Sequence, residues 1–226
     1  MQEVVEYDRL LPYQFRARML QAPLAYVPMG SLEWHGEHMA IGNDAIKMHG
    51  LMVQAARIGG GIVFPPIFFG IPGMTDFQPP HEFNGNMPYE EPLIRALLVR
   101  TLEGLQRVGF EAAVLATGHT CGEQRQLMRD VVSDYSGTMR VVGTDDASFG
   151  NAMGHFSDHA AKWETSILWY LHPELVDIHR LEHDTSIPNA GVFGDDPRLH
   201  ASRELGEQVV GQIAREIAKL GRSLLQ

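Results

Sequence analysis

Short apolar runs that alternate with helix-patterned segments restrict the fold of this chain more than any other feature of its sequence. Residues 24–27, 62–64, 111–116 and 139–142 read as buried strands. Between them, residues 44–57, 94–108 and 123–135 read as helices, as do the opening segment to residue 21 and residues 205–220. Strands separated by helices favour a parallel sheet with both faces covered. The sequence therefore predicts an α/β protein with a mainly parallel sheet, as one domain over residues 1–226.

Composition excludes several classes of partner. The 226 residues carry 18 basic and 28 acidic side chains, a net charge of -10, which argues against binding to nucleic acid or to an anionic membrane. The single cysteine, Cys121, excludes an internal disulfide. The first residues lack a signal-peptide pattern, and no apolar run approaches the roughly 20 residues that span a bilayer. We expect a cytoplasmic protein whose partner is a small-molecule substrate.

The densest group of candidate metal ligands follows the first predicted strand. Residues 30–38 read GSLEWHGEH and residues 42–44 read GND, which places Glu33, His35 and Asp44 within twelve positions. Residues two apart in an extended segment project to the same side, so Glu33 and His35 can face one point. Asp44 opens a predicted helix from which it can reach back. Two oxygen ligands and one nitrogen ligand suit Zn²⁺, Mn²⁺ or Fe²⁺.

Further polar side chains follow the other predicted strands. His119 comes after the third strand, and Asp145 and Asp146 end the fourth. Ligands of parallel sheets bind beyond the carboxyl ends of the strands, where all these residues are expected. His159 and Glu164 lie five positions apart and would not share a face of one helix, but they converge if His159 precedes that helix.

Taken together, these motifs resemble the creatininase (creatinine amidohydrolase) family. Residues 30–44 resemble its metal-binding signature, residues 159–166 (HAAKWETS) its second signature, and residues 191–195 (GVFGD) its C-terminal pattern. The resemblance implies a Rossmann-like three-layer fold, hydrolysis of C–N bonds in cyclic or formyl amides, and homo-oligomers, hexamers among them. It also implies two divalent ions, Zn²⁺ or Mn²⁺ with Fe²⁺ as the alternative. The implied ligands are Glu33, His35, Asp44 as the bridge, His119 and Glu164, with His159 as the proton-transfer residue beside Glu164.

The chain also departs from the family pattern. Thr117 stands where the family usually has Asn, and Cys121 stands where creatininase carries a ligand glutamate, so either Cys121 or Glu123 is a candidate for the missing ligand. Residues 70–91 are rich in Gly, Pro and Asn, and a loop of this length in a compact domain is usually functional or disordered. We expect substrate contacts from His81, Asn84 and Asn86 in this loop and from Trp163.

The predicted reaction is attack of a metal-bridged hydroxide on the carbonyl of a small cyclic amide or formamide, with His159 protonating the leaving group. Two alternatives stay open. The same metal site could open a cyclic polyol ketone at a C–C bond, or the chain could be a non-catalytic metal-binding subunit. An ion with closed, four-ligand coordination would favour the latter, because catalytic sites keep an open position.

Overall fold

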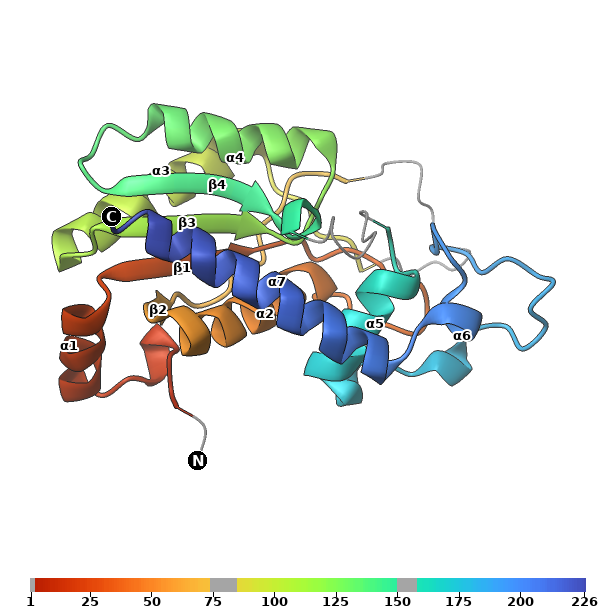
Figure 1. The fold of residues 1–226 in the computed structure, drawn as a ribbon. Coiled ribbons are helices and arrows are strands. Elements are labelled where there is room, and N and C mark those ends of the chain that lie inside the picture. The colour runs from red at the N-terminus through yellow and green to blue at the C-terminus, as the bar shows by residue number, and fades with distance from the viewer. Residues whose placement is uncertain (1–2, 74–84, 150–157) are drawn as a thin grey trace.

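A four-stranded parallel sheet forms the centre of the molecule (Figure 1). The computed structural model describes residues 3–73, 85–149 and 158–226. The strand order is β2-β1-β3-β4, with β1 at Leu24–Met29, β2 at Ile62–Val63, β3 at Ala112–Thr117 and β4 at Arg140–Asp145. All pairings are parallel, so the carboxyl ends of β1, β3 and β4 come together at one edge.

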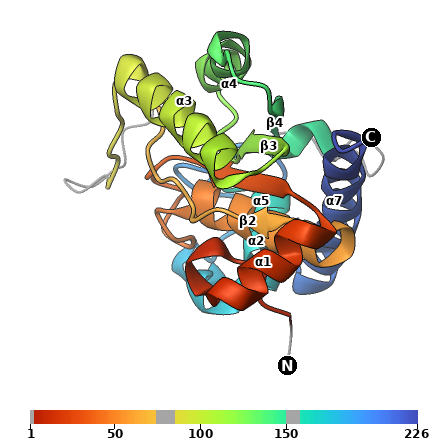
Figure 2. The same cartoon turned by 90° about the vertical axis from the view of Figure 1, so that its left-hand side faces the viewer.

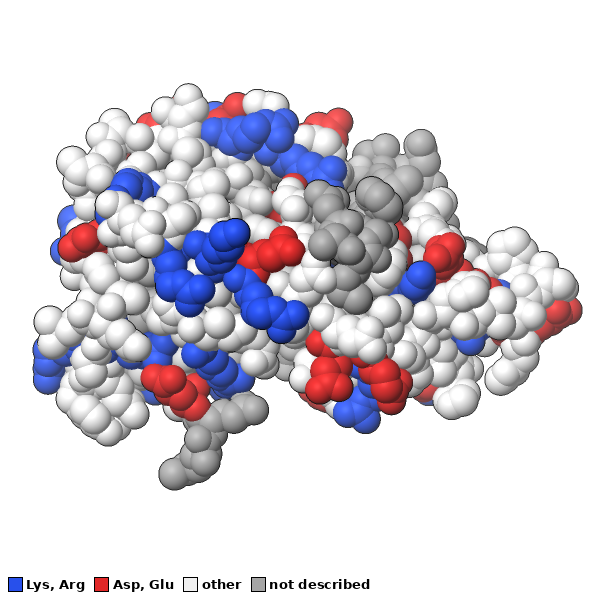
Figure 3. Space-filling model, in the orientation of Figure 1, with Lys and Arg blue, Asp and Glu red and all other residues white. Residues whose placement is uncertain are grey.

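Helices cover both faces of this sheet. α3 and α4 lie on one face, and α2 and α7 lie on the other, while α1 packs beside the amino end of β1 (Figures 1 and 2). α5 packs against α2 and α7 beyond the carboxyl ends of the strands. Basic side chains gather over α7 on the face drawn in Figure 3. The bounds are α1 Pro12–Gln21, α2 Asn43–Gly59, α3 Glu91–Val108, α4 Gly122–Asp134, α5 Lys162–Leu171, α6 Pro197–His200 and α7 Arg203–Ser223.

Each face of the sheet has its own apolar core. Alternate residues of β3 point to opposite sides, so Val114 joins the cluster under α2 and α7, whereas Leu115 joins the cluster under α3 and α4. The closing helix α7 contributes the stripe predicted from its spacing, including Val209, Ile213 and Ile217. The three-layer α/β prediction is confirmed.

The predicted elements are present with shifted ends. β1 and β4 each run farther than predicted, because both pair with β3 as far as its last residue, Thr117. Met29 of β1 lies opposite Thr117 on one side, and Asp145 of β4 lies opposite it on the other. The predicted second strand shortens to Ile62–Val63 before the Pro65–Pro66 pair. None of the helices in the described ranges combines the length and apolar character needed to cross a bilayer.

Candidate metal centre

Asp44 lies where the carboxyl ends of β1 and β3 meet the start of α2. It is the second residue of α2 and is 1% exposed. Two glycines allow this close approach: a Cβ at Gly30 would clash with the side chain and backbone of Asp44, and a Cβ at Gly118 would clash with its carbonyl. The carboxylate is therefore held between the two strand ends, where it faces ligands from both.

One oxygen of Asp44 belongs to a first group of ligand atoms with Glu33 and His119. His119 Nδ1 lies 3.1 Å from Asp44 Oδ2 and 3.1 Å from Glu33 Oε2. The Thr117 hydroxyl accepts a hydrogen bond from the His119 amide at 3.0 Å, which fixes the turn that carries the imidazole. Glu33, Asp44 and His119 offer ligand atoms that all lie within 4.8 Å of one another. We call this group the His119 position.

The other oxygen of Asp44 belongs to a second group, with His35 and Glu164. His35 Nε2 lies 3.1 Å from Asp44 Oδ1 and 3.3 Å from Glu164 Oε2. All three side chains are buried, and their ligand atoms also lie within 4.8 Å of one another. We call this group the His35 position. Asp44 is thus placed to bridge two cations, one at each position.

The protonation of His35 shows that a cation fits the second group. Its Nδ1 lies 2.9 Å from the backbone carbonyl of Glu33, an oxygen that only accepts, so Nδ1 carries a proton. Nε2 is buried and makes no hydrogen bond of acceptable geometry with the described residues, although two carboxylates face it. Burial alone would lower the pKa of His35, but Asp44 and Glu164 raise it well above its usual value. A proton or a metal ion must therefore separate Nε2 from the carboxylates.

A buried lysine adjoins the His35 position. Lys47, one turn along α2 from Asp44, is 1% exposed, and its Nζ lies 2.6 Å from Glu164 Oε1 and 2.8 Å from Asp146 Oδ2. Burial alone would lower the pKa of Lys47, but Asp146 and Glu164 raise it above its usual value, so the ammonium stays charged. Burial alone would raise the pKa of Glu164, but Lys47 and His35 hold it well below its usual value. Glu164 is thus an ionised carboxylate with one oxygen on Lys47 and the other toward His35.

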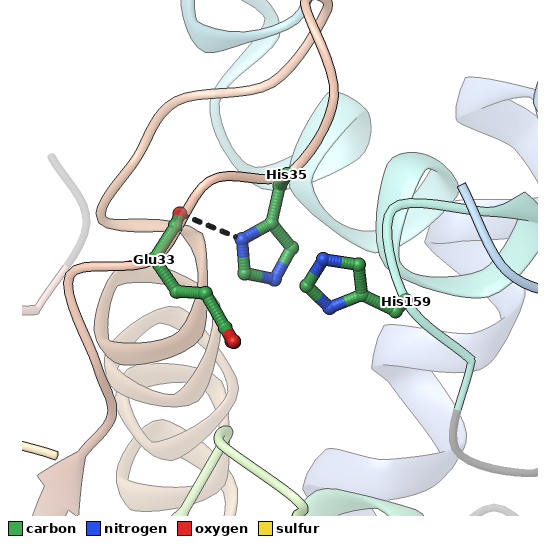
Figure 4. Close-up of side chains that lie close together, drawn as sticks. All are labelled: Glu33, His35 and His159. Atoms are coloured by element: carbon green, nitrogen blue, oxygen red, sulfur yellow. Dashed lines mark hydrogen bonds between the residues drawn. The ribbon is translucent and has the colours of Figure 1, made fainter. Parts of the chain in front are cut away.

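His159 lies in the loop before α5, and its ring packs against that of His35 with centroids 4.2 Å apart (Figure 4). Its Nε2 lies 3.0 Å from the Trp34 carbonyl, which only accepts, so Nε2 carries the proton and donates a hydrogen bond to that oxygen. An antiparallel bridge to Phe193 fixes its backbone, and Ala160 after it adopts a φ of +51°. Such strain is concentrated at functional sites. The Ala160 amide also donates a hydrogen bond to Glu164 Oε2 at 2.8 Å, which ties this loop to the candidate ligand Glu164.

Burial lowers the pKa of His159, and the neighbouring charge of His35 lowers it further, so the ring is neutral near pH 7. With the proton on Nε2, Nδ1 is the nitrogen that accepts. His159 also forms a third possible ligand group with Glu33 and His35, whose ligand atoms lie within 4.8 Å (Figure 4). The geometry thus permits two roles for His159, as a proton carrier and as a ligand.

The ligand groups open into a cleft of about 190 Å³. Asp158 lies on its wall and caps α5 by accepting the amides of Trp163 at 2.8 Å and Glu164 at 3.2 Å. Cys121 Sγ lies 3.4 Å from His119 Nε2, on the side of the ring away from the carboxylates. The lining residues are Glu33, Asp44, Gly118, His119, Thr120, Cys121, Asp158, His159, Glu164 and Phe193.

The residues expected to contact substrate have different positions. Asn86 accepts a hydrogen bond from the Trp34 amide at 2.6 Å and so anchors the loop that carries Glu33 and His35. Trp163 packs against the apolar cluster under α2 and α7, with Lys162 Nζ 4.3 Å from its ring, and is not among the lining residues of the cleft. His81 and Asn84 lie outside the described residues. Glu123 is exposed in the first turn of α4, so Cys121 is the nearer of the two candidates to His119.

Sequence reasoning missed Lys47 and the partnership it forms with Asp146. A signal was available, because Lys47 falls on the buried side of a predicted helix, among Ala45, Met48 and Leu51. A lysine in such a place is almost never fully buried unless it is paired. The sequence did not show which carboxylates would pair with it.

The sequence model of the creatinine amidohydrolase family matches residues 10–220. The chain therefore belongs to the creatininase family, whose members are hydrolases. Creatinine amidohydrolase of Pseudomonas putida is 23% identical over 225 residues, covering 85% of this chain and 86% of that protein. The 3-dehydro-scyllo-inosose hydrolase of Thermotoga maritima is 28% identical over 117 residues, and this match spans 51% of the chain but only 36% of that relative.

Solved structures show the same fold. A crystal structure of creatinine amidohydrolase superposes with a TM-score of 0.81 at 21% identity, covering 98% of each chain. A manganese form of creatininase gives a TM-score of 0.78 at 22% identity, with the same coverage of both chains. A Zn–Zn form of a creatininase mutant is also among the similar structures. At these identities the likeness establishes the fold, and the candidate ligand groups are features of this chain itself.

Proposed function

We propose that this protein is a divalent-metal-dependent hydrolase that cleaves a C–N bond in a small cyclic amide or formamide. The observation that carries the proposal is the pair of ligand groups sharing Asp44, each with one imidazole nitrogen and two carboxylates, at the base of an open cleft. A divalent ion lowers the pKa of a bound water from 15.7 to about 7 and polarises a carbonyl, which is the chemistry that amide hydrolysis needs. A cleft of about 190 Å³ beside the ligand groups supports catalysis over a purely structural site, because a catalytic ion needs room for water and substrate.

The chain's own residues would divide the remaining steps. Glu33, Asp44, His119, His35 and Glu164 would hold the ions. His159 is neutral and has Nδ1 as its accepting nitrogen, so it would take a proton from the attacking water and deliver it to the leaving nitrogen. The Trp34 carbonyl would keep the imidazole in this tautomer throughout. Asp158, Thr120 and Phe193 line the remaining wall, where the substrate would lie.

One alternative has support of its own. The Thermotoga maritima relative bears the name of a cyclic-ketone hydrolase, and opening such a ring at a C–C bond would use the same ligand set and the same proton carrier. This second candidate predicts activity on polyhydroxylated cyclic ketones in place of amides. We also propose that the chain forms a homo-oligomer such as a hexamer, in keeping with the family resemblance.

A panel of substrates tests the proposal. Metal-stripped protein would be reconstituted with Zn²⁺, Mn²⁺ or Fe²⁺ and assayed on lactams, formamides, short peptides and cyclic polyol ketones. Hydrolysis of a lactam or formamide, dependent on added metal, is the expected result. Activity confined to ketones would favour the second candidate. Reconstituted protein that holds metal but hydrolyses nothing in the panel would favour a non-catalytic metal-binding subunit. Protein that binds no ion would contradict the amide hydrolase, the ketone hydrolase and the metal-binding subunit alike.

A further inference from the structure

We propose that Lys47 is a built-in cation of the metal centre that weakens the His35 position relative to the His119 position, so that the two ions bind with unequal affinity. This inference rests on the metal-binding part of the proposed function and goes beyond it, because it assigns the order of loading to one residue outside both ligand groups.

The first step of the argument is a shared carboxylate. Glu164 Oε1 is 2.6 Å from Lys47 Nζ, and Glu164 Oε2 is 3.3 Å from His35 Nε2. An ion bound at the His35 position would therefore use a carboxylate that an ammonium already neutralises. Two cations on one buried carboxylate repel each other, and water does not screen them because all the side chains involved are buried.

The second step is the asymmetry between the positions. The ligands of the His119 position are Glu33, Asp44 and His119, and none of the ion pairs among the described residues joins Lys47 to any of them. The longer-range attraction between Lys47 and Asp44 acts on a carboxylate that both positions share, so it does not distinguish them. Lys47 Nζ also donates a hydrogen bond to the Gly118 carbonyl at 3.4 Å. The ammonium is therefore held by the turn after β3, by Glu164 and by Asp146. It cannot move away from Glu164 without losing one of the two carboxylates that balance its buried charge.

The third step is that Asp146 moderates the effect. Its Oδ2 lies 2.8 Å from Lys47 Nζ and balances part of the ammonium charge. Removing that carboxylate while keeping Lys47 should increase the repulsion of an ion at the His35 position. Removing both should relieve it. A residue that merely filled space or supported Glu164 would not produce opposite effects in these two variants.

Mn²⁺ binding to metal-stripped protein tests the proposal without any substrate. Free Mn²⁺ is counted by its electron paramagnetic resonance signal during a titration, and folding of each variant is checked by circular dichroism and thermal unfolding. The wild type should bind two ions, the second at least about tenfold more weakly than the first. Asp146→Asn should weaken only the second ion. The double variant Lys47→Met/Asp146→Asn should bind the second ion about tenfold more tightly than the wild type.

Matched variants assign the two binding steps. Glu164→Gln should remove the weaker step and Glu33→Gln the tighter one. Lys219→Met removes the same charge from an exposed position on α7 and should change neither constant.

Two equal sites in the wild type, loss of the tighter step in Glu164→Gln, or an unchanged or weaker second ion in the double variant would each overturn the proposal. In all of those cases metal still binds, so the proposed hydrolase survives. Wild-type protein that binds no Mn²⁺ and no Zn²⁺ would instead defeat the proposed function itself, and this inference with it.

Discussion

The two ligand groups of the candidate metal centre share Asp44 but differ in what surrounds them. The His119 position is built from the loops after β1 and β3 and from the start of α2. The His35 position adds a ligand from α5, which is joined to α2 by the buried ion pair of Lys47 and Glu164. The comparison teaches that two ligand sets of the same composition, each with one imidazole and two carboxylates, have different charges packed behind them.

Removing the shared ligand should have the largest effect. Asp44→Asn takes a charged oxygen from both positions at once, so we expect bound metal to fall from two ions per chain to none and hydrolysis to fall to background. Metal content after dialysis, measured by mass spectrometry, checks this. The control is Asp134→Asn, an exposed carboxylate paired with Arg95, which should keep both ions. Retention of one ion in Asp44→Asn would show that Asp44 does not bridge.

Removing a ligand from only one position should separate the two. Glu164→Gln should lower the free energy of unfolding of the metal-free protein by about 3 kcal/mol, because it breaks a buried ion pair and removes one of the negative charges that balance Lys47. Glu33→Gln leaves that pair intact and should cost less than half as much. The free energies of unfolding come from urea titrations at pH 7 in the presence of a chelator. Equal losses would mean that Lys47 does not distinguish the positions.

Substitution of His159 tests whether a fourth residue belongs to either position. If His159 transfers a proton, His159→Ala should keep both ions and lower kcat by about 10²–10⁴-fold on any amide that the wild type hydrolyses. His179→Ala, at an exposed histidine, is the control and should leave kcat unchanged. Loss of an ion from His159→Ala would identify it as a ligand of the group that it forms with Glu33 and His35.

The smallest expected effect concerns pH and His38. Burial lowers the pKa of His38 to about 4, and its Nε2 lies 2.9 Å from the hydroxyl of Thr165, the residue after Glu164. Because the folded state binds the proton less readily than the unfolded state, His38 should reduce stability as pH falls below about 6.5, by about 2 kcal/mol between pH 7 and pH 5. His38→Gln should remove that part of the acid slope. An identical slope in both proteins would show that His38 titrates normally when folded.

The fold was predictable because its elements are local. Apolar runs such as residues 112–116 and the stripe on α7 carry their periodicity in the sequence, and parallel pairing follows from the helices between them. The ends of the strands were less predictable. β4 continues to Asp145 through Gly143 and Thr144, which have no apolar signal, because its neighbour β3 supplies the hydrogen-bonding partners.

The candidate site divides in the same way. The spacing of Glu33, His35 and Asp44 predicted one point shared by all three, whereas the structure places Glu33 and His35 in two different groups that share Asp44. The approach of His119 was expected from its place after a parallel strand. Residues far apart in the sequence had no such guide. The pairing of Lys47 with Glu164 spans 117 positions, and the positions of Cys121 and Phe193 on the cleft wall depend on how the loops pack.

From the sequence alone came the parallel α/β architecture, the family resemblance and the residue types that can hold divalent ions, because these follow from periodicity and short-range spacing. Only the tertiary structure decided that Asp44 stands between two ligand groups, that Glu164 gives one oxygen to a buried lysine, and that Trp163 packs against an apolar cluster and not on the cleft wall. The physical reason is that burial and the distance between charges depend on contacts across the whole chain, and these quantities determine what a carboxylate or an imidazole does.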